Sequence, residues 1–215
     1  MKSWALLETE INSQYSKRFE KFGPTAKGVF WASTTRQEKR FEIILKEIQK
    51  ISQNHIVLEI ADIGCGYGSF VHYLNKHVNR TMLNYWGFDI NTRFIEHCRS
   101  KFSEPNLKFV IGNRPLSKKD FITISGTYNL ATTTDVSLWE QYLFTCLSEC
   151  WANTKIAMIF NLQTAKKKKI TSQNIYYANT SEIIDYCVAN FGPTRILRDN
   201  HCLLYTSDAA DDLLC

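Results

Sequence analysis

The chain has 215 residues, of which 44% are hydrophobic, and a formal net charge of +5. This length and composition predict a single globular domain with a sizeable core. No apolar run approaches the roughly 20 residues that span a bilayer, and the start lacks the long apolar region of a secretory signal, so we expect a cytoplasmic protein without a membrane segment.

The first 50 residues predict a helical cap that precedes the sheet. Apolar residues recur every three or four positions from Ser3 to Phe22, a spacing typical of an amphipathic helix. Gly23-Pro24 ends this helix, and a second helix is predicted over residues 35–51. Between the two helices, Trp31 either packs the cap onto the sheet or lines the mouth of an active site.

The stretch IVLEIADIGCGYG, residues 56–68, carries the strongest signal. It begins as an apolar run typical of a parallel strand covered on both faces. Three glycines then alternate at Gly64, Gly66 and Gly68, and a helix is predicted from Ser69. Glycine lets the backbone approach a ligand closely, and the helix N-terminus offers N–H groups that have no partner within the helix. We therefore expect a cofactor here, since a tight turn alone does not need three alternating glycines.

The next strand is predicted over residues 82–89 and ends in Asp89. An acid at this place can accept hydrogen bonds from both ribose hydroxyls of a nucleoside. A strand-end aspartate can also merely cap the following helix. The glycine-rich stretch favours the first interpretation.

The spacing of the glycines distinguishes between nucleotide cofactors. The dinucleotide fingerprint G-x-G-x-x-G needs its third glycine where Ser69 stands. The order here is acid-x-G-x-G-x-G, beginning at Asp62, with an acid at the end of the next strand. In this form the stretch resembles the first motif of class I S-adenosylmethionine-dependent methyltransferases. The resemblance implies S-adenosylmethionine as cofactor and a set of binding residues, which are Asp62, Gly64, Cys65, Gly66, Gly68, Asp89, Ile90, Asn113 and Thr133.

The resemblance continues through the third and fourth strands, predicted over residues 107–111 and 127–134. Relatives often place an aspartate at the position of Asn113 to accept from the adenine amino group, and an amide oxygen can still accept that bond. Asn129 is a second change from acid to amide. Family position would put Thr133 and Asp135 at the carboxyl edge of the sheet, where Asp135 acts as a base or caps the next helix.

Strand and helix alternate to the end of the chain. A helix is predicted over residues 138–151, a strand over 155–162, a helix over 182–191 and a strand over 194–198. This alternation predicts an α/β fold with a doubly wound, mostly parallel, Rossmann-like sheet. The Y-Y-A motif at Tyr176 and Tyr177 is similar to one in bacterial methyltransferase-domain proteins of unassigned substrate; these two tyrosines shape a substrate pocket or pack a loop.

Residues 202–215 are set apart from the fold. Their first ten residues, CLLYTSDAAD, resemble the translation of a transposon adapter used in sequencing libraries, so we interpret the tail as an artefact that truncates the natural protein near His201. The predicted domains are a cap over residues 1–50 and a methyltransferase domain over 51–201. In this interpretation the final antiparallel strand of the fold is missing, or the tail imitates it.

Two further sequence patterns, in the cysteines and in a run of lysines, bear on metal binding and on nucleic-acid binding. Seven cysteines show no paired metal spacing, so we expect reduced, mostly buried thiols and no metal site. The run Lys166–Lys169 can contact phosphates, but most short lysine runs are solvated loops, and nucleic acid is not favoured.

The predicted function is methyl transfer from S-adenosylmethionine to an unidentified small molecule, which Trp31, Arg40, Tyr176 and Tyr177 would help to bind. An RNA-directed enzyme or a non-catalytic methyltransferase-like binding protein is the alternative. An NAD-dependent oxidoreductase is disfavoured by Ser69 and by the absence of a second catalytic domain.

Overall fold

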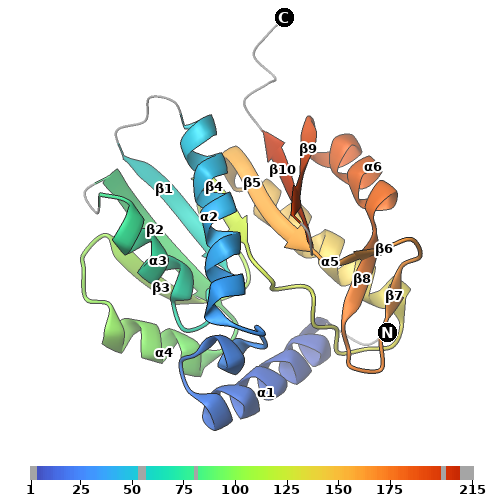
Figure 1. Ribbon diagram of the computed structural model, residues 1–215, viewed down its shortest axis with the longest axis horizontal. Helices are drawn as coiled ribbons and strands as arrows, with labels where there is room; N and C mark the ends of the chain where they lie inside the picture. Colours follow the sequence, from blue (N-terminus) through green and yellow to red (C-terminus); the bar gives the residue numbers. More distant parts are fainter. Residues whose placement is uncertain (1–3, 53–56, 80–81, 200–201, 209–215) are drawn as a thin grey trace, which may run out of the picture. The chain divides into compact units, whose positions relative to one another are not determined.

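The structure, a computed structural model, describes residues 4–52, 57–79, 82–199 and 202–208 (Figure 1). The chain divides into two compact units. One unit is Glu8–Asn113, and the other joins Met1–Leu7 to Arg114–Cys215. None of the described helices is both long and apolar enough to cross a bilayer.

The unit Glu8–Asn113 holds three parallel strands in the order β3-β2-β1. Its elements are α1 (Trp4–Phe22, which begins in the other unit), the 3₁₀ helix η1 (Ala26–Val29), α2 (Thr34–Ile51), β1 (Leu58–Ile63), α3 (Ser69–His77), β2 (Leu83–Asp89), α4 (Thr92–Lys101) and β3 (Leu107–Ile111). Helix α4 packs on β2 and β3, and α2 packs on α3. The two predicted cap helices are therefore present, and at least α2 belongs to the same compact unit as the first three strands.

Apolar side chains at helical spacing fix α2 in this unit. Phe41, Ile44 and Ile48 are all buried. The ring of Phe41 lies 5.0 Å from that of Phe70 in α3. Burying an isoleucine or phenylalanine side chain stabilises a fold by about 1.5–3 kcal/mol, so this face holds α2 against α3.

The second unit contains the later strands in the order β4-β5-β10-β9, with a small sheet ordered β6-β8-β7. Its elements are β4 (Lys119–Ile124), α5 (Val136–Trp151), β5 (Thr154–Leu162), β6 (Thr164–Ala165), β7 (Lys169–Ile170), β8 (Tyr176–Asn179), α6 (Thr180–Phe191), β9 (Thr194–Asp199) and β10 (Cys202–Asp208). β4 and β5 are parallel. Strands β1 to β5 and the helices between them confirm the predicted doubly wound, mostly parallel architecture.

The predicted fourth strand is wrong. Residues 127–134 form turns and irregular backbone, with one isolated bridge from Leu130 to Ile175. The strand is instead Lys119–Ile124, all six residues of which are buried. A central strand needs side chains that can be buried on both faces, and Thr134 is exposed, so the earlier stretch satisfies that requirement and the later one does not.

The final antiparallel strand is present as β10, within the residues interpreted as an adapter-derived tail. It pairs antiparallel with β5, where Leu203 lies opposite Leu162, and with β9, where Leu203 lies opposite Arg198. β10 therefore lies between β5 and β9 in the sheet. Both neighbouring edges are thereby paired, which removes the exposed backbone that an absent strand would leave.

The cysteines that the structure describes in full agree with the prediction of buried, reduced thiols. All of them are buried thiols that form no disulfide; they are Cys65, Cys98, Cys146, Cys150 and Cys187. Cys146 and Cys150 lie within α5.

Candidate functional site

The glycine loop, Gly64–Gly68, joins β1 to α3. Its three glycines have φ values of 74°, 55° and 82°, all in the left-handed region, which L side chains rarely adopt. The N–H groups of Gly64 and Cys65 both donate to the carbonyl of Phe88 in β2, at 2.7 and 3.0 Å. This conformation leads directly into the N-terminus of α3, where the first N–H groups of a helix are available to an anionic group.

Asp89, at the end of β2, is bonded to the glycine loop. The carboxylate is buried; Oδ2 accepts from the N–H of Gly66 at 2.9 Å, and Oδ1 accepts from the N–H of Asn91 at 2.8 Å. Burial raises the pKa of Asp89 to about 6, although both hydrogen bonds act in the opposite direction. An ionised carboxylate has about four acceptor positions, so Asp89 can also accept hydrogen bonds from ligand hydroxyls.

Asp62 and Cys65 are placed in the interior of the same unit. Oδ2 of Asp62 accepts from the hydroxyl of Tyr85 at 2.7 Å, and both residues are buried. Burial raises the pKa of the Cys65 thiol well above its ordinary value, so it remains neutral. Asp62 thus helps to join β1 to β2, while Ile90 is half-buried directly after Asp89.

Helix α1 contacts the residues that follow β2 and β3, which sequence reasoning missed. Nδ2 of Asn113 donates to Oε1 of Glu8 at 2.8 Å. Nδ2 of Asn91 donates to the carbonyl of Asn12 at 3.3 Å and to Oγ of Ser16 at 2.8 Å. Glu8, Asn12 and Ser16 are spaced four residues apart, so the sequence indicates that they share one face of a helix. It does not indicate which residues that face contacts.

Tyr15 extends this arrangement towards Asp89. Its ring lies edge-on to Phe30 at 5.1 Å and to Phe94 at 6.2 Å. Burial, and then the negative charge of Asp89, raise the pKa of the Tyr15 hydroxyl, so this side chain stays protonated near the carboxylate. It was not among the predicted site residues.

Helix α2 supports the glycine loop from another direction. Nε2 of Gln37 donates to Oγ of Ser69 at 3.0 Å, and its Oε1 accepts from the hydroxyl of Tyr67 at 3.1 Å. Arg40 is buried on the same helix, and Trp31, before the helix, is half-buried. The structure therefore places these two of the four predicted substrate residues in the unit that holds the glycine loop.

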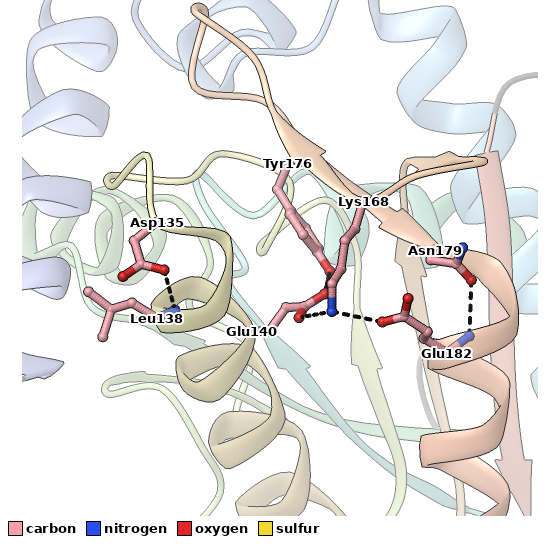
Figure 2. Close-up of polar contacts among 7 residues, drawn as sticks. All are labelled: Asp135, Leu138, Glu140, Lys168, Tyr176, Asn179 and Glu182. Carbon is pink, nitrogen blue, oxygen red and sulfur yellow. Dashed lines mark hydrogen bonds and ion pairs between the residues drawn. The ribbon is translucent and has the colours of Figure 1, made fainter.

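The remaining predicted residues belong to the other unit. Asp135 is the N-cap of α5, because its Oδ1 accepts from the N–H of Leu138 at 3.1 Å (Figure 2). Capping is one of the two roles that the sequence predicts for Asp135, the other being a base. Thr133 likewise makes a hydrogen bond to a residue close in the sequence, since its Oγ1 accepts from the N–H of Asp135 at 3.1 Å.

Tyr176 anchors the small sheet. The side chain is fully buried, and its hydroxyl donates to Oε1 of Glu140 in α5 at 2.8 Å (Figure 2). Nζ of Lys168 donates to Oε2 of the same Glu140 and to Oε2 of Glu182, both at 2.8 Å. Tyr177 is half-buried, with the Lys169 ammonium 5.5 Å from its ring. Packing of the loop therefore accounts for the position of Tyr176.

Comparison with known proteins shows similarity to methyltransferases. Residues 60–155 match a family model described as a methyltransferase domain. A candidate methyltransferase of Mycobacterium tuberculosis, Rv1506c, is 23% identical over 146 residues, which cover 67% of this chain and 87% of that protein. By this match and by its fold, the chain resembles class I S-adenosylmethionine-dependent methyltransferases. Among its described residues, no group of three or more His, Cys, Asp or Glu side chains is placed to hold a metal ion.

Solved structures agree with this methyltransferase fold. Magnesium protoporphyrin IX methyltransferase from Synechocystis PCC 6803, with bound S-adenosylhomocysteine, is 11% identical and gives a TM-score of 0.68, covering 96% of this chain and 99% of that one. An S-adenosylmethionine-dependent methyltransferase of Leishmania major is also 11% identical and gives a TM-score of 0.65, covering 92% of this chain and 82% of that one.

Replacing Gly68 tests whether the glycine loop tolerates a side chain. A Cβ on Gly68 would come within 2.5 Å of the ring of Phe102, which is stacked on Phe109. We expect Gly68→Ala to lower the free energy of unfolding by about 1–2 kcal/mol for its positive φ and by about 1–3 kcal/mol more for overpacking. Urea denaturation measures the change.

Gly23 offers the matched control, because its φ is +63° and a Cβ there would meet nothing within 4 Å. Gly23→Ala should therefore show only the cost of the positive φ. Equal losses in the two variants would contradict the close packing around Gly68.

Replacing Tyr176 tests its role as an anchor. Tyr176→Phe removes the donor to buried Glu140, so the free energy of unfolding should fall by about 1–3 kcal/mol. Tyr177→Phe should change it by less than about 0.5 kcal/mol, because this side chain is only half-buried. Denaturant titration of both variants decides, and a neutral Tyr176→Phe would refute the anchoring role.

Proposed function

We propose that the chain transfers the methyl group of S-adenosylmethionine to a small-molecule acceptor. The observation that supports this most is the hydrogen bond from Gly66 to Asp89. It joins a loop whose backbone only glycine adopts readily to a buried carboxylate, and so brings main-chain donors and a hydroxyl acceptor together. Those are the two kinds of group that a charged nucleoside with a free ribose requires.

Residues of the unit Glu8–Asn113 would each bind a different part of this cofactor. The glycine loop would hold the amino-acid end through main-chain N–H groups, and Asp89 would accept from the ribose hydroxyls. Ile90 would flank the adenine, and Asn113 would accept from its amino group. Thr133 belongs to the other unit, and its predicted cofactor contact remains a sequence prediction.

The cofactor supplies a methyl group already activated on a sulfonium. The chain therefore has only to bind it, orient the acceptor for in-line attack and exclude water. Neither a covalent nucleophile nor a metal is needed for this task. Asp135, Tyr176 and Tyr177 remain predictions for the base and for acceptor binding.

The lysine run supports a small molecule over a nucleic acid. Lys168 is engaged by Glu140 and Glu182, and the Lys169 ammonium lies over the ring of Tyr177. Within this run, two of the cations thus contact groups of the chain itself, which lowers their value as phosphate ligands. RNA-directed methylation and non-catalytic binding are the alternatives that the acceptor experiment below distinguishes.

Binding should depend on the ionisation of Asp89. Its pKa in the free protein is raised to about 6, so the carboxylate is charged at pH 7.5 and mostly protonated at pH 5. A ligand that donates hydroxyls to the ionised form loses affinity as the pH falls through 6. By calorimetry we expect S-adenosylhomocysteine to bind about tenfold more weakly at pH 5 than at pH 7.5.

Asp89→Asn is the control for this pH dependence, because an amide does not titrate in this range. The variant should bind more weakly at pH 7.5 and show a flat profile between the two pH values. A wild-type chain that bound NAD in preference to S-adenosylhomocysteine would contradict the proposed cofactor. A pH dependence retained by Asp89→Asn would remove Asp89 from the site.

The chemical class of the methyl acceptor can be found by fractionating a cell extract. The chain is incubated with S-adenosylmethionine labelled in the methyl group and with a cell extract separated into small molecules, RNA and protein. We expect label to enter the small-molecule fraction, and Asp89→Asn to reduce the rate at least about tenfold. Label in RNA would establish the first alternative, and binding of cofactor without transfer to any fraction would favour the second.

A further inference from the structure

Asn113 poses a chemical question that an aspartate at the same position would not. A carboxylate presents an acceptor in either orientation, whereas an amide presents an oxygen on one branch and an NH₂ on the other. The first would accept from the 6-amino group of adenine, and the second would donate to a 6-oxo group. What holds the amide therefore decides which purine it recognises.

Glu8 supplies that constraint. Nδ2 of Asn113 lies 2.8 Å from Oε1 of Glu8, and an ionised carboxylate can only accept hydrogen bonds. The opposite orientation of the amide would set two acceptors against each other. The NH₂ must therefore face Glu8, and Oδ1 occupies the other branch. A carbonyl oxygen accepts two hydrogen bonds, so Oδ1 can take a ligand donor in addition to another contact.

The position of Glu8 is itself fixed. Glu8 lies on α1, which is held by the bonds from Nδ2 of Asn91 to Asn12 and Ser16. These bonds lie one and two turns further along the same helix. The preceding residue, Leu7, is buried. Glu8 is therefore presented to Asn113 by an anchored helix rather than by a free side chain of a loop.

We propose that Glu8 is a specificity-determining positioning residue, which orients the amide of Asn113 so that the site selects a 6-amino purine over a 6-oxo purine. The inference rests on the proposed function, in which Asn113 meets the adenine. Glu8 does not touch the purine; it acts only through the orientation of the Asn113 amide.

The test compares two ligands that differ at one position of the purine. S-adenosylhomocysteine carries the 6-amino group, and S-inosylhomocysteine carries a 6-oxo group. By calorimetry the wild-type chain should prefer the first by at least about tenfold, because the second faces Oδ1 with an acceptor. In Glu8→Gln the new amide can donate to Oδ1 of Asn113, so Asn113 can present its NH₂ and the preference should fall towards one.

Two controls separate orientation from structure. Glu10→Gln makes the same change of charge at an exposed position of α1 and should keep the wild-type ratio. Glu8→Gln combined with Asn113→Asp should recover the preference, because aspartate is an acceptor in both orientations and the introduced glutamine can donate to it. A merely structural Glu8 would weaken both ligands alike, leave the ratio unchanged and gain nothing from the added Asn113→Asp substitution.

The outcomes distinguish this inference from the function on which it rests. If the wild-type chain binds neither ligand, the proposed cofactor site is wrong. If it binds S-adenosylhomocysteine and Glu8→Gln keeps the wild-type ratio, only the role of Glu8 is overturned. Should Glu8→Gln fail to fold, Glu8→Ala replaces it: loss of the acceptor alone should lower the ratio, and an unchanged ratio would overturn the inference.

Discussion

The hydrogen bond between Gly66 and Asp89 is the constraint on which the shape of the glycine loop depends. It connects positions 23 residues apart and satisfies a carboxylate that would be costly to bury without donors. In return it fixes the direction of an N–H group in a loop of high conformational freedom. The loop is therefore shaped before a ligand arrives, and the ligand does not have to order it.

The same carboxylate begins a chain of contacts that reaches α1. Asp89 accepts from the main chain of Asn91. The side chain of Asn91 accepts from the N–H groups of Arg93 and Phe94 at the start of α4 and donates to Asn12 and Ser16. One asparagine thus caps a helix and holds another. Most of α1 accordingly belongs to the same compact unit as the first three strands.

Local sequence patterns predicted much of the unit Glu8–Asn113. They failed where pairing between distant segments decides which residues form a strand or a contact. The glycine spacing and the acid at Asp89 were readable because both lie within short segments, and the bounds of β3 were predicted correctly. Lys119–Ile124 and residues 127–134 are both plausible strands by composition. Pairing with β5 distinguishes the first from the second. Glu8 could not be assigned from the sequence, because its partner Asn113 is 105 residues away. The packing role of Tyr176 could be assigned only once its burial was known.

The two changes from acid to amide differ in what the structure explains. At position 113, Nδ2 donates to Glu8; an aspartate would instead repel that carboxylate, so the amide and Glu8 require each other. At position 129, Oδ1 accepts from the N–H of Gln163 at 2.9 Å, a bond that an aspartate would make equally well. The contact therefore gives no reason for an amide at Asn129. A departure from a family motif carries information only when the new group makes a bond that the old one could not, and Asn113 meets that condition.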